Sequence, residues 1–93
     1  MSDRIARIRA LLEAAFTPEA LRVDDDSHLH AGHAGARGGA GHYRVDIVAA
    51  GFAGMTAVAR HRAVYAALGE MMPREIHALS IRARTPDEAP QPI

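Results

Sequence analysis

Histidine is the residue of this 93-residue chain best suited to metal chemistry, because the sequence holds six histidines and no cysteine. His28, His30 and His33 are spaced by two and three positions, and His77 stands in the apolar segment Ile76-His-Ala-Leu79. Neutral imidazole binds zinc, nickel and iron, which makes these four side chains candidate ligands. They also have plainer interpretations. His77 on an apolar strand is often a satisfied core side chain, and the other three are compatible with solvated residues or adventitious zinc or nickel binding.

A fifth histidine, His61, is flanked by charged residues. His61 lies between Arg60 and Arg62 in a segment with helical periodicity. The apolar side chains of this segment lie along one side of the expected helix, and His61 falls on the same side one turn earlier. Arg60 and Arg62 then point about 100° to either side of it. We expect a buried imidazole that holds a backbone carbonyl, with contact to a partner molecule or a bound metal group as the alternative. The arginines are expected to leave the core and face phosphate, a carboxylate or water. His42, at a strand start, is interpreted as structural.

Composition argues against several classes of function. Without cysteine there is no disulfide, no thiolate nucleophile and no metal site built from cysteine alone. Residues 1–50 carry six Arg against seven acids, and residues 51–93 five against four, so the halves have charges of −1 and +1. Strong non-specific nucleic-acid binding requires clustered basic residues, which a neutral, mixed surface does not favour. No Ser–His–acid set is identifiable, and we expect a non-enzymatic protein.

Targeting signals are also absent from the printed sequence. No apolar run approaches the roughly 20 residues that span a bilayer. The first residues, Met1-Ser-Asp-Arg-Ile-Ala-Arg7, have no apolar signal-peptide core. We therefore expect a cytoplasmic protein without a membrane segment.

Hydrophobic periodicity in the first half predicts a helix followed by two strands. An apolar stripe starting at Ile5 gives a helix that Ser2 caps and that ends near Phe16, because Pro18 disfavours helical geometry in the residue before it. Alternation predicts strands around residues 21–23 and 43–47. Between them, Asp26 to Gly41 holds five of the eight glycines and three of the six histidines, which predicts a long, mobile and functional loop.

The second half predicts a helix and a third strand. The helix runs from about Ala57 to Met72, where Pro73 stops it, with an apolar stripe at Val64, Tyr65, Leu68 and Met72. The third strand, Ile76 to Thr85, places His77 on the same face as Leu79, Ile81 and Ala83 if its pairing is regular, with Ser80, Arg82 and Arg84 on the other face. Gly51-Phe-Ala-Gly54 before the helix is a turn; its G-x-x-G spacing also occurs in phosphate-clamping KH loops.

These elements predict an α+β fold in a single small domain. The order αββαβ packs a three-stranded sheet under two main helices, and it is also the order of class II KH-like domains. We place the domain at residues 1–88. The proline-containing end from Pro86 to Ile93 is expected to be irregular, and residues 89–93 are taken as the tail outside the domain.

The chain resembles the BolA family over about residues 4 to 88. The motifs that carry the resemblance are short but occur in a specific order and spacing. They are Asp25-Asp-Ser27 with His30 three residues on, His42-Tyr-Arg-Val45, Phe52-Ala-Gly54, Arg60-His-Arg62 with Val64 and Leu68, and Ile76-His-Ala-Leu79 leading to Thr85-Pro86.

The resemblance implies partnership with a monothiol glutaredoxin and a [2Fe–2S] cluster shared with that protein and glutathione. It assigns one ligand to His77 and a second to the loop between the first two strands. His30 matches the family position by its distance from Ser27, and His33 is an alternative. The sequence departs from the family's Glu-Thr-His-Phe at Ala40-Gly-His-Tyr43. A second family role, DNA-binding transcriptional regulation, would need Arg60, Arg62, Arg82 and Arg84 to converge on one face. Alone, the chain is expected to be a monomer or weak homodimer.

The chemistry of a shared cluster is consistent with a chain that lacks thiolates. Imidazoles replace two thiolates on one iron in Rieske centres. Two histidines and two external thiolates would therefore complete a [2Fe–2S] cluster. Because imidazole ligands compete with protons, we expect such a complex to loosen as the pH falls below ~6.

Overall fold

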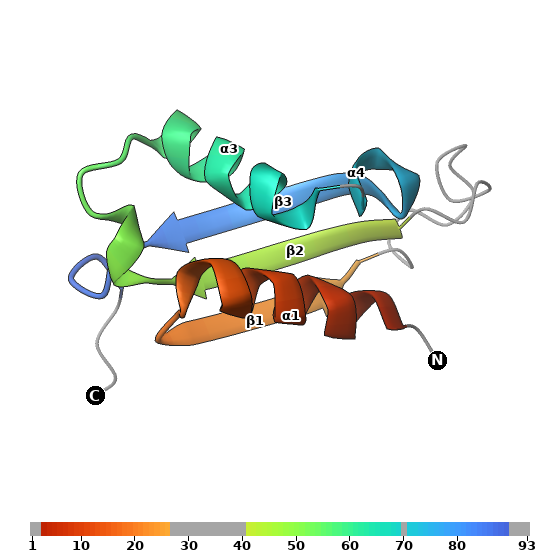
Figure 1. Cartoon of the computed structure of the whole chain (residues 1–93), viewed down its shortest axis with the longest axis horizontal. Coiled ribbons are helices and arrows are strands. Elements are labelled where there is room, and N and C mark those ends of the chain that lie inside the picture. Colours follow the sequence, from red (N-terminus) through yellow and green to blue (C-terminus); the bar gives the residue numbers. More distant parts are fainter. Residues whose placement is uncertain (1–2, 27–40, 70, 90–93) are drawn as a thin grey trace.

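The structure, a computed structural model, describes residues 3–26, 41–69 and 71–89. Its elements follow the predicted order (Figure 1). They are α1 (Asp3–Phe16), β1 (Ala20–Asp25), β2 (Gly41–Val48), the 3-10 turn η2 (Ala50–Phe52), α3 (Ala57–Leu68), the single turn α4 (Met71–Arg74) and β3 (Ile76–Arg84). The candidate ligands His28, His30 and His33 lie outside the described residues.

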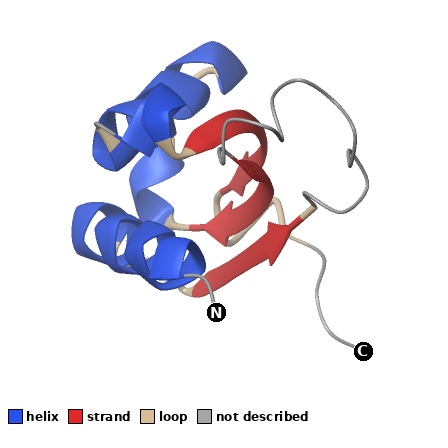
Figure 2. Ribbon diagram, turned by 90° about the vertical axis from the view of Figure 1, so that its right-hand side faces the viewer, coloured by secondary structure: helices blue, strands red, loops and turns tan. Residues whose placement is uncertain are grey.

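The three strands form one mixed sheet in the order β1-β2-β3. β1 and β2 are antiparallel, and β2 and β3 are parallel, as expected when a helix connects them. The two long helices lie on the same side of the sheet, and no described element covers the opposite face (Figure 2). The predicted α+β fold of two main helices on a three-stranded sheet is confirmed.

The core lies between the helices and the middle of the sheet. Its fully buried side chains come from both helices and from the sheet. Phe52 of η2 closes one end of the core, where its ring centroid lies 4.9 Å from that of Phe16. The largest fully buried side chains are Ile8, Leu12, Val45, Ile47, Phe52, Val64, Leu68 and Ile76. They recur about once per turn in the helices and at every second residue in β2. The apolar side of each helix therefore packs against the apolar face of the sheet.

The second long helix is shorter than predicted. α3 begins at the Thr56 cap, whose hydroxyl accepts a hydrogen bond from the Ala59 N–H at 3.1 Å, and it ends at Leu68 instead of Met72. Gly69 adopts φ = 55°, a conformation that glycine tolerates best, and thereby reverses the chain. Met72 is extended, as is usual for a residue before proline. Tyr65, expected in the apolar stripe, is 40 % exposed.

The start of the predicted irregular tail is ordered. In Thr85-Pro-Asp-Glu88 the Thr85 N–H donates to the Glu88 carboxylate at 2.9 Å, and the Glu88 N–H donates to the Thr85 carbonyl at 3.0 Å. This reciprocal arrangement resembles a capping box, whose S/T-x-x-E spacing the sequence contains. Residues 86–89 thus form a hydrogen-bonded turn without helix or strand, and the domain boundary at residue 88 stays a prediction.

Candidate functional site

The beginning of β3 contains a β-bulge at His77. Gly41 of β2 pairs with Ile76 and the next residue, His42, pairs with Ala78, so His77 is an extra residue without a partner position. Ile76 is consequently buried and His77 exposed, whereas regular pairing would give the reverse. The expectation that His77 shares the face of the apolar side chains is wrong, because it assumed regular pairing.

The bulge brings His77 beside a second histidine. The rings of His42 and His77 lie 5.1 Å apart between centroids, tilted by 53°. His42 begins the outward-facing set of β2, which continues with Arg44 and Asp46 and opposes the buried Tyr43, Val45 and Ile47. Two imidazoles from adjacent strands thus meet at one end of the sheet. Sequence reasoning assigned His42 only a structural role, since a contact between strands depends on their register.

The connection that contains His30 and His33 starts and ends at this same place. The Asp26 N–H donates to the His42 carbonyl at 2.8 Å, and the Gly41 N–H donates to the Glu75 carbonyl at 3.0 Å. His30 follows Asp26 by four residues, and an extended chain covers at most about 14 Å over that length. Asp26 and Gly41, the described residues that flank positions 27–40, therefore lie next to His42 and to the start of the strand that carries His77.

His61 is exposed, and Arg60 occupies the position that we predicted for it. The Arg60 side chain, 13 % exposed, donates from Nε to the Met55 carbonyl and from Nη1 to the Ala83 carbonyl, each at 3.0 Å. The buried stripe through Val64 continues backward by four residues to Arg60 and not by three to His61. Arg60 therefore joins helix to sheet, so the expectation that it leaves the core is wrong. Arg62 is exposed, as expected.

Arg60 is also paired with Glu88. Its Nη1 and Nη2 atoms lie 2.6 and 3.2 Å from the two carboxylate oxygens. The hydrogen bonds from Arg60, followed by the one from the Thr85 N–H, lower the pKa of Glu88 to about 2. The same hydrogen bond to Glu88 raises the pKa of Arg60. This arginine is thus committed to structure and is a poor contact for nucleic acid.

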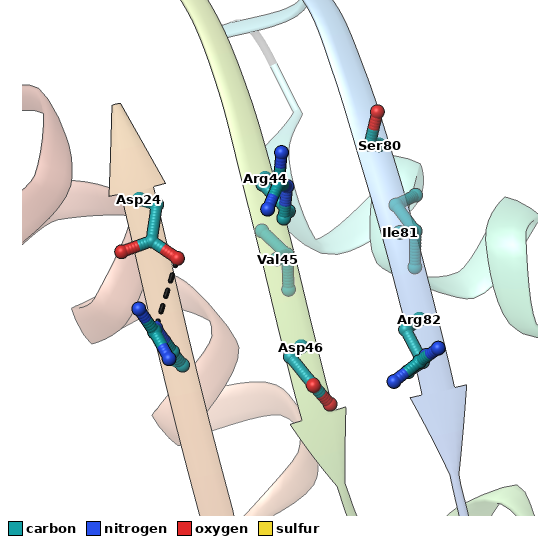
Figure 3. A pocket seen from close by; sticks show the side chains of 8 residues that line it. Asp24, Arg44, Val45, Asp46, Ser80, Ile81 and Arg82 are labelled. Atoms are coloured by element: carbon teal, nitrogen blue, oxygen red, sulfur yellow. Dashed lines mark ion pairs between the residues drawn. The ribbon is translucent and has the colours of Figure 1, made fainter. Parts of the chain in front are cut away.

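The outward-facing side of the sheet is charged, with Asp24, Arg44, Asp46 and Arg82 side by side on its strands (Figure 3). Three ion pairs span it, with nitrogen–oxygen distances of 2.9 to 3.0 Å; they are Arg22–Asp24, Arg44–Asp26 and Arg84–Asp46. A shallow cavity of about 390 Å³ lies among four of these side chains, Arg22, Asp24, Arg44 and Asp46, and also contacts Ser80 and Arg82. The four arginines of the DNA-binding hypothesis do not form one free basic face, because Arg60 and Arg84 are each held by a carboxylate.

The two imidazoles at the start of β3 differ in their exposure. His77 is exposed, whereas His42 is half-buried and its Nε2 atom lies beneath the surface. In the part of the chain that the structure describes, no group of three or more His, Asp or Glu side chains could hold a metal ion. None of the described helices has the length and apolar character needed to cross a membrane.

The fold and site define a small α+β domain with a histidine pair at the bulged start of its last strand. The family model described as BolA-like protein matches residues 12–88, and the chain belongs to this family. It is 43 % identical over 93 residues to the chloroplastic protein BOLA1 of Arabidopsis thaliana, covering 97 % of this chain and 58 % of that protein. It is 44 % identical over 81 residues to BolA-like protein 1 of the mouse, covering 87 % and 57 %. The chain thus spans less than two thirds of these relatives.

A bacterial relative and two solved structures extend the comparison. The DNA-binding transcriptional regulator BolA of Haemophilus influenzae is 35 % identical over 81 residues, covering 87 % of this chain and 76 % of that protein. The structure of BolA1 from Arabidopsis thaliana superposes with a TM-score of 0.82 at 39 % identity, covering 97 % of this chain and all of that one. The BolA domain of SufE1 from the same plant gives 0.85 at 40 % identity, covering 96 % and 99 %.

Proposed function

We propose that this BolA-family protein is a non-enzymatic adaptor that binds a monothiol glutaredoxin and co-ligates a bridging [2Fe–2S] cluster through His77. The observation that carries the proposal is the bulge that exposes His77 beside His42, close to Asp26 and Gly41, the residues that flank positions 27–40. The glutaredoxin cysteine and glutathione supply the thiolates that this chain lacks. In this role the protein transfers clusters or reports iron and redox status.

The proposal gives His42 one of two roles beside His77. If a loop histidine, His30 or His33, is the second ligand, then His42 packs against the His77 ring and orients it. If neither loop histidine binds, then His42 is the second ligand itself, because its ring is already adjacent. Supporting groups that orient a metal-bound imidazole commonly tune affinity, which makes the two roles separable by the size of the defect.

The test is a titration of the protein into a glutaredoxin loaded with [2Fe–2S], followed by visible absorption and circular dichroism. The wild type should produce a new spectrum that His77→Ala abolishes. Single variants at His30, His33 and His42 identify the second ligand, since loss of that ligand changes the spectrum and loss of a positioning residue only weakens binding. His61→Ala is the histidine control: His61 is also exposed, and its loss should leave the cluster spectrum at saturation unchanged even if docking weakens. A wild-type titration without spectral change would refute the proposal.

DNA binding is the second candidate, favoured by the relative named a DNA-binding transcriptional regulator. The charge distribution of the described residues supports it weakly, because most arginines on the sheet are paired with aspartates. The logarithm of DNA affinity falls with the logarithm of salt concentration by about 0.9 per neutralised phosphate. We expect a slope of about 2 or less on random duplex DNA. A slope of about 5 or more that Arg62→Ala reduces would favour the regulator.

A further inference from the structure

β3 is an edge strand whose outer side is only partly occupied. In the described part of the sheet it pairs with β2 alone. Near its end, Arg60 Nη1 donates to the Ala83 carbonyl at 3.0 Å from the helix side. The next carbonyl, that of Arg84, accepts from the Ala49 N–H at 2.9 Å on the side of β2. Consecutive peptide groups of β3 thus point to opposite sides.

This alternation identifies which peptide groups of β3 face outward. The pairing with β2 is regular from Ala78 to Arg84, beyond the bulge. In an extended strand the N–H and C=O of one residue point to the same side, and those of its neighbours point to the other. Leu79 and Ile81 therefore direct their peptide groups outward like Ala83, whereas Ser80 and Arg82 face β2. Such a row of outward donors and acceptors is a template for another strand.

A groove beside this edge carries a positive charge that no described residue neutralises. It has a volume of about 430 Å³, and its polar lining includes Arg60, His61, Arg82 and Glu88. Glu88 is bound to Arg60. Arg82 makes no ion pair with any described residue and is exposed. An extended segment that pairs with Leu79 and Ile81 could place a carboxylate beside Arg82 and neutralise its charge.

The exposed His77 lies on this same strand, two residues before Leu79. A protein that brings thiolates to His77 must therefore sit at the start of β3, next to the open edge. We propose that the glutaredoxin partner docks an extended, acidic segment along the outer edge of β3 as an added strand, with a carboxylate on Arg82. This inference rests on the proposed function and names the surface by which that function would be carried out.

Amide hydrogen exchange tests the added strand residue by residue. The mixed complex is formed with cluster-loaded glutaredoxin, exchanged, then quenched and stripped of iron before NMR of this chain. Added-strand pairing should slow exchange of the Leu79 and Ile81 amides by at least ~10-fold. The Ser80 and Arg82 amides, already bonded within the sheet, serve as internal controls and should change little. Uniform slowing from residue 78 to 82, or none at Leu79 and Ile81, overturns the inference.

Charge reversal supplies an independent readout. Arg82→Glu should weaken the complex by about tenfold while the cluster spectrum at saturation stays that of the wild type. Arg22→Glu, the same change on the far strand of the same face, should have little effect. If both reversals weaken binding equally, the contact is general electrostatics and the edge is not the docking site. If wild type forms no mixed complex, the proposed function and the docking mode fail together; if the complex forms with a freely exchanging edge, only the docking mode fails.

Discussion

Arg60 and Glu88 form a doubly hydrogen-bonded ion pair that fastens the segment after β3 to the first turns of α3, with nitrogen–oxygen distances of 2.6 and 3.2 Å. The guanidinium simultaneously bonds the Ala83 carbonyl in the sheet and lies 6.0 Å from the centre of the Phe52 ring. One side chain therefore connects a helix, a strand, the core and the C-terminal turn. Its role is to hold these layers in place, which frees His61 and Arg62 to face solvent.

The ion pair between Arg60 and Glu88 should make the free energy of unfolding depend on pH. The pKa of Glu88 falls from its usual 4.5 to about 2 in the folded protein, so folding favours its ionised form. Its stabilisation is present above about pH 4.5 and is lost as the pH falls toward 2. Urea unfolding followed by circular dichroism between pH 2 and 6 should show a smaller pH dependence for Glu88→Gln than for wild type. Identical pH profiles would show that the pair does not contribute.

The two arginines that flank His61 should differ sharply in their effect on stability. Arg60→Ala removes two hydrogen bonds to carbonyls and the partner of Glu88, and should lower the midpoint of thermal unfolding clearly. Arg62→Ala, at an exposed position of the same helix, should leave it nearly unchanged. Differential scanning calorimetry of both variants decides the matter, and equal shifts would contradict the assignment of Arg60 to the helix–sheet junction.

Adjacent leucines of α1 provide a matched test of the core. Leu12 is completely buried, whereas Leu11 is 38 % exposed. Leu12→Ala should reduce the free energy of unfolding by ~2–5 kcal/mol, from lost apolar burial and the cavity left behind. Leu11→Ala should cost ~1 kcal/mol or less, since much of that side chain stays in contact with water. Chemical denaturation measures both, and a similar loss for the two would mean that α1 is rotated from the orientation described.

Gly69 at the end of α3 should not tolerate substitution, because of its backbone conformation. Its φ of 55° strains any residue with a Cβ, although the nearest heavy atom to an added Cβ is 4.0 Å away. Gly69→Ala should therefore destabilise the fold by about 1 kcal/mol through backbone strain, without a steric clash. Gly51→Ala is the control, because Gly51 lacks a positive φ and has open space around it. Comparable unfolding curves for both variants would count against α3 ending at Leu68.

The family, the fold class and the order of the elements could all be predicted from the residues alone. Apolar spacing around Ile8 and Leu12 gives an amphipathic helix, and alternation around Val45 gives a half-buried strand, because both periods are set by local backbone geometry. The prolines and glycines between these elements mark where each one ends. The candidate metal-binding residues His77, His30 and His33 were likewise visible as residue types, and their roles stay predictions.

Only the tertiary structure decided which side chains face each other. One extra residue in β3 moves His77 from the apolar side to solvent and places it against His42, and such an irregularity depends on how β2 pairs with β3. On α3, steps of three and four residues project to nearby directions, so periodicity could not choose between His61 and Arg60 for the junction. Arg60 takes this position because it can bond three acceptors, the carbonyls of Met55 and Ala83 and the carboxylate of Glu88. These acceptors come together only when the chain is folded.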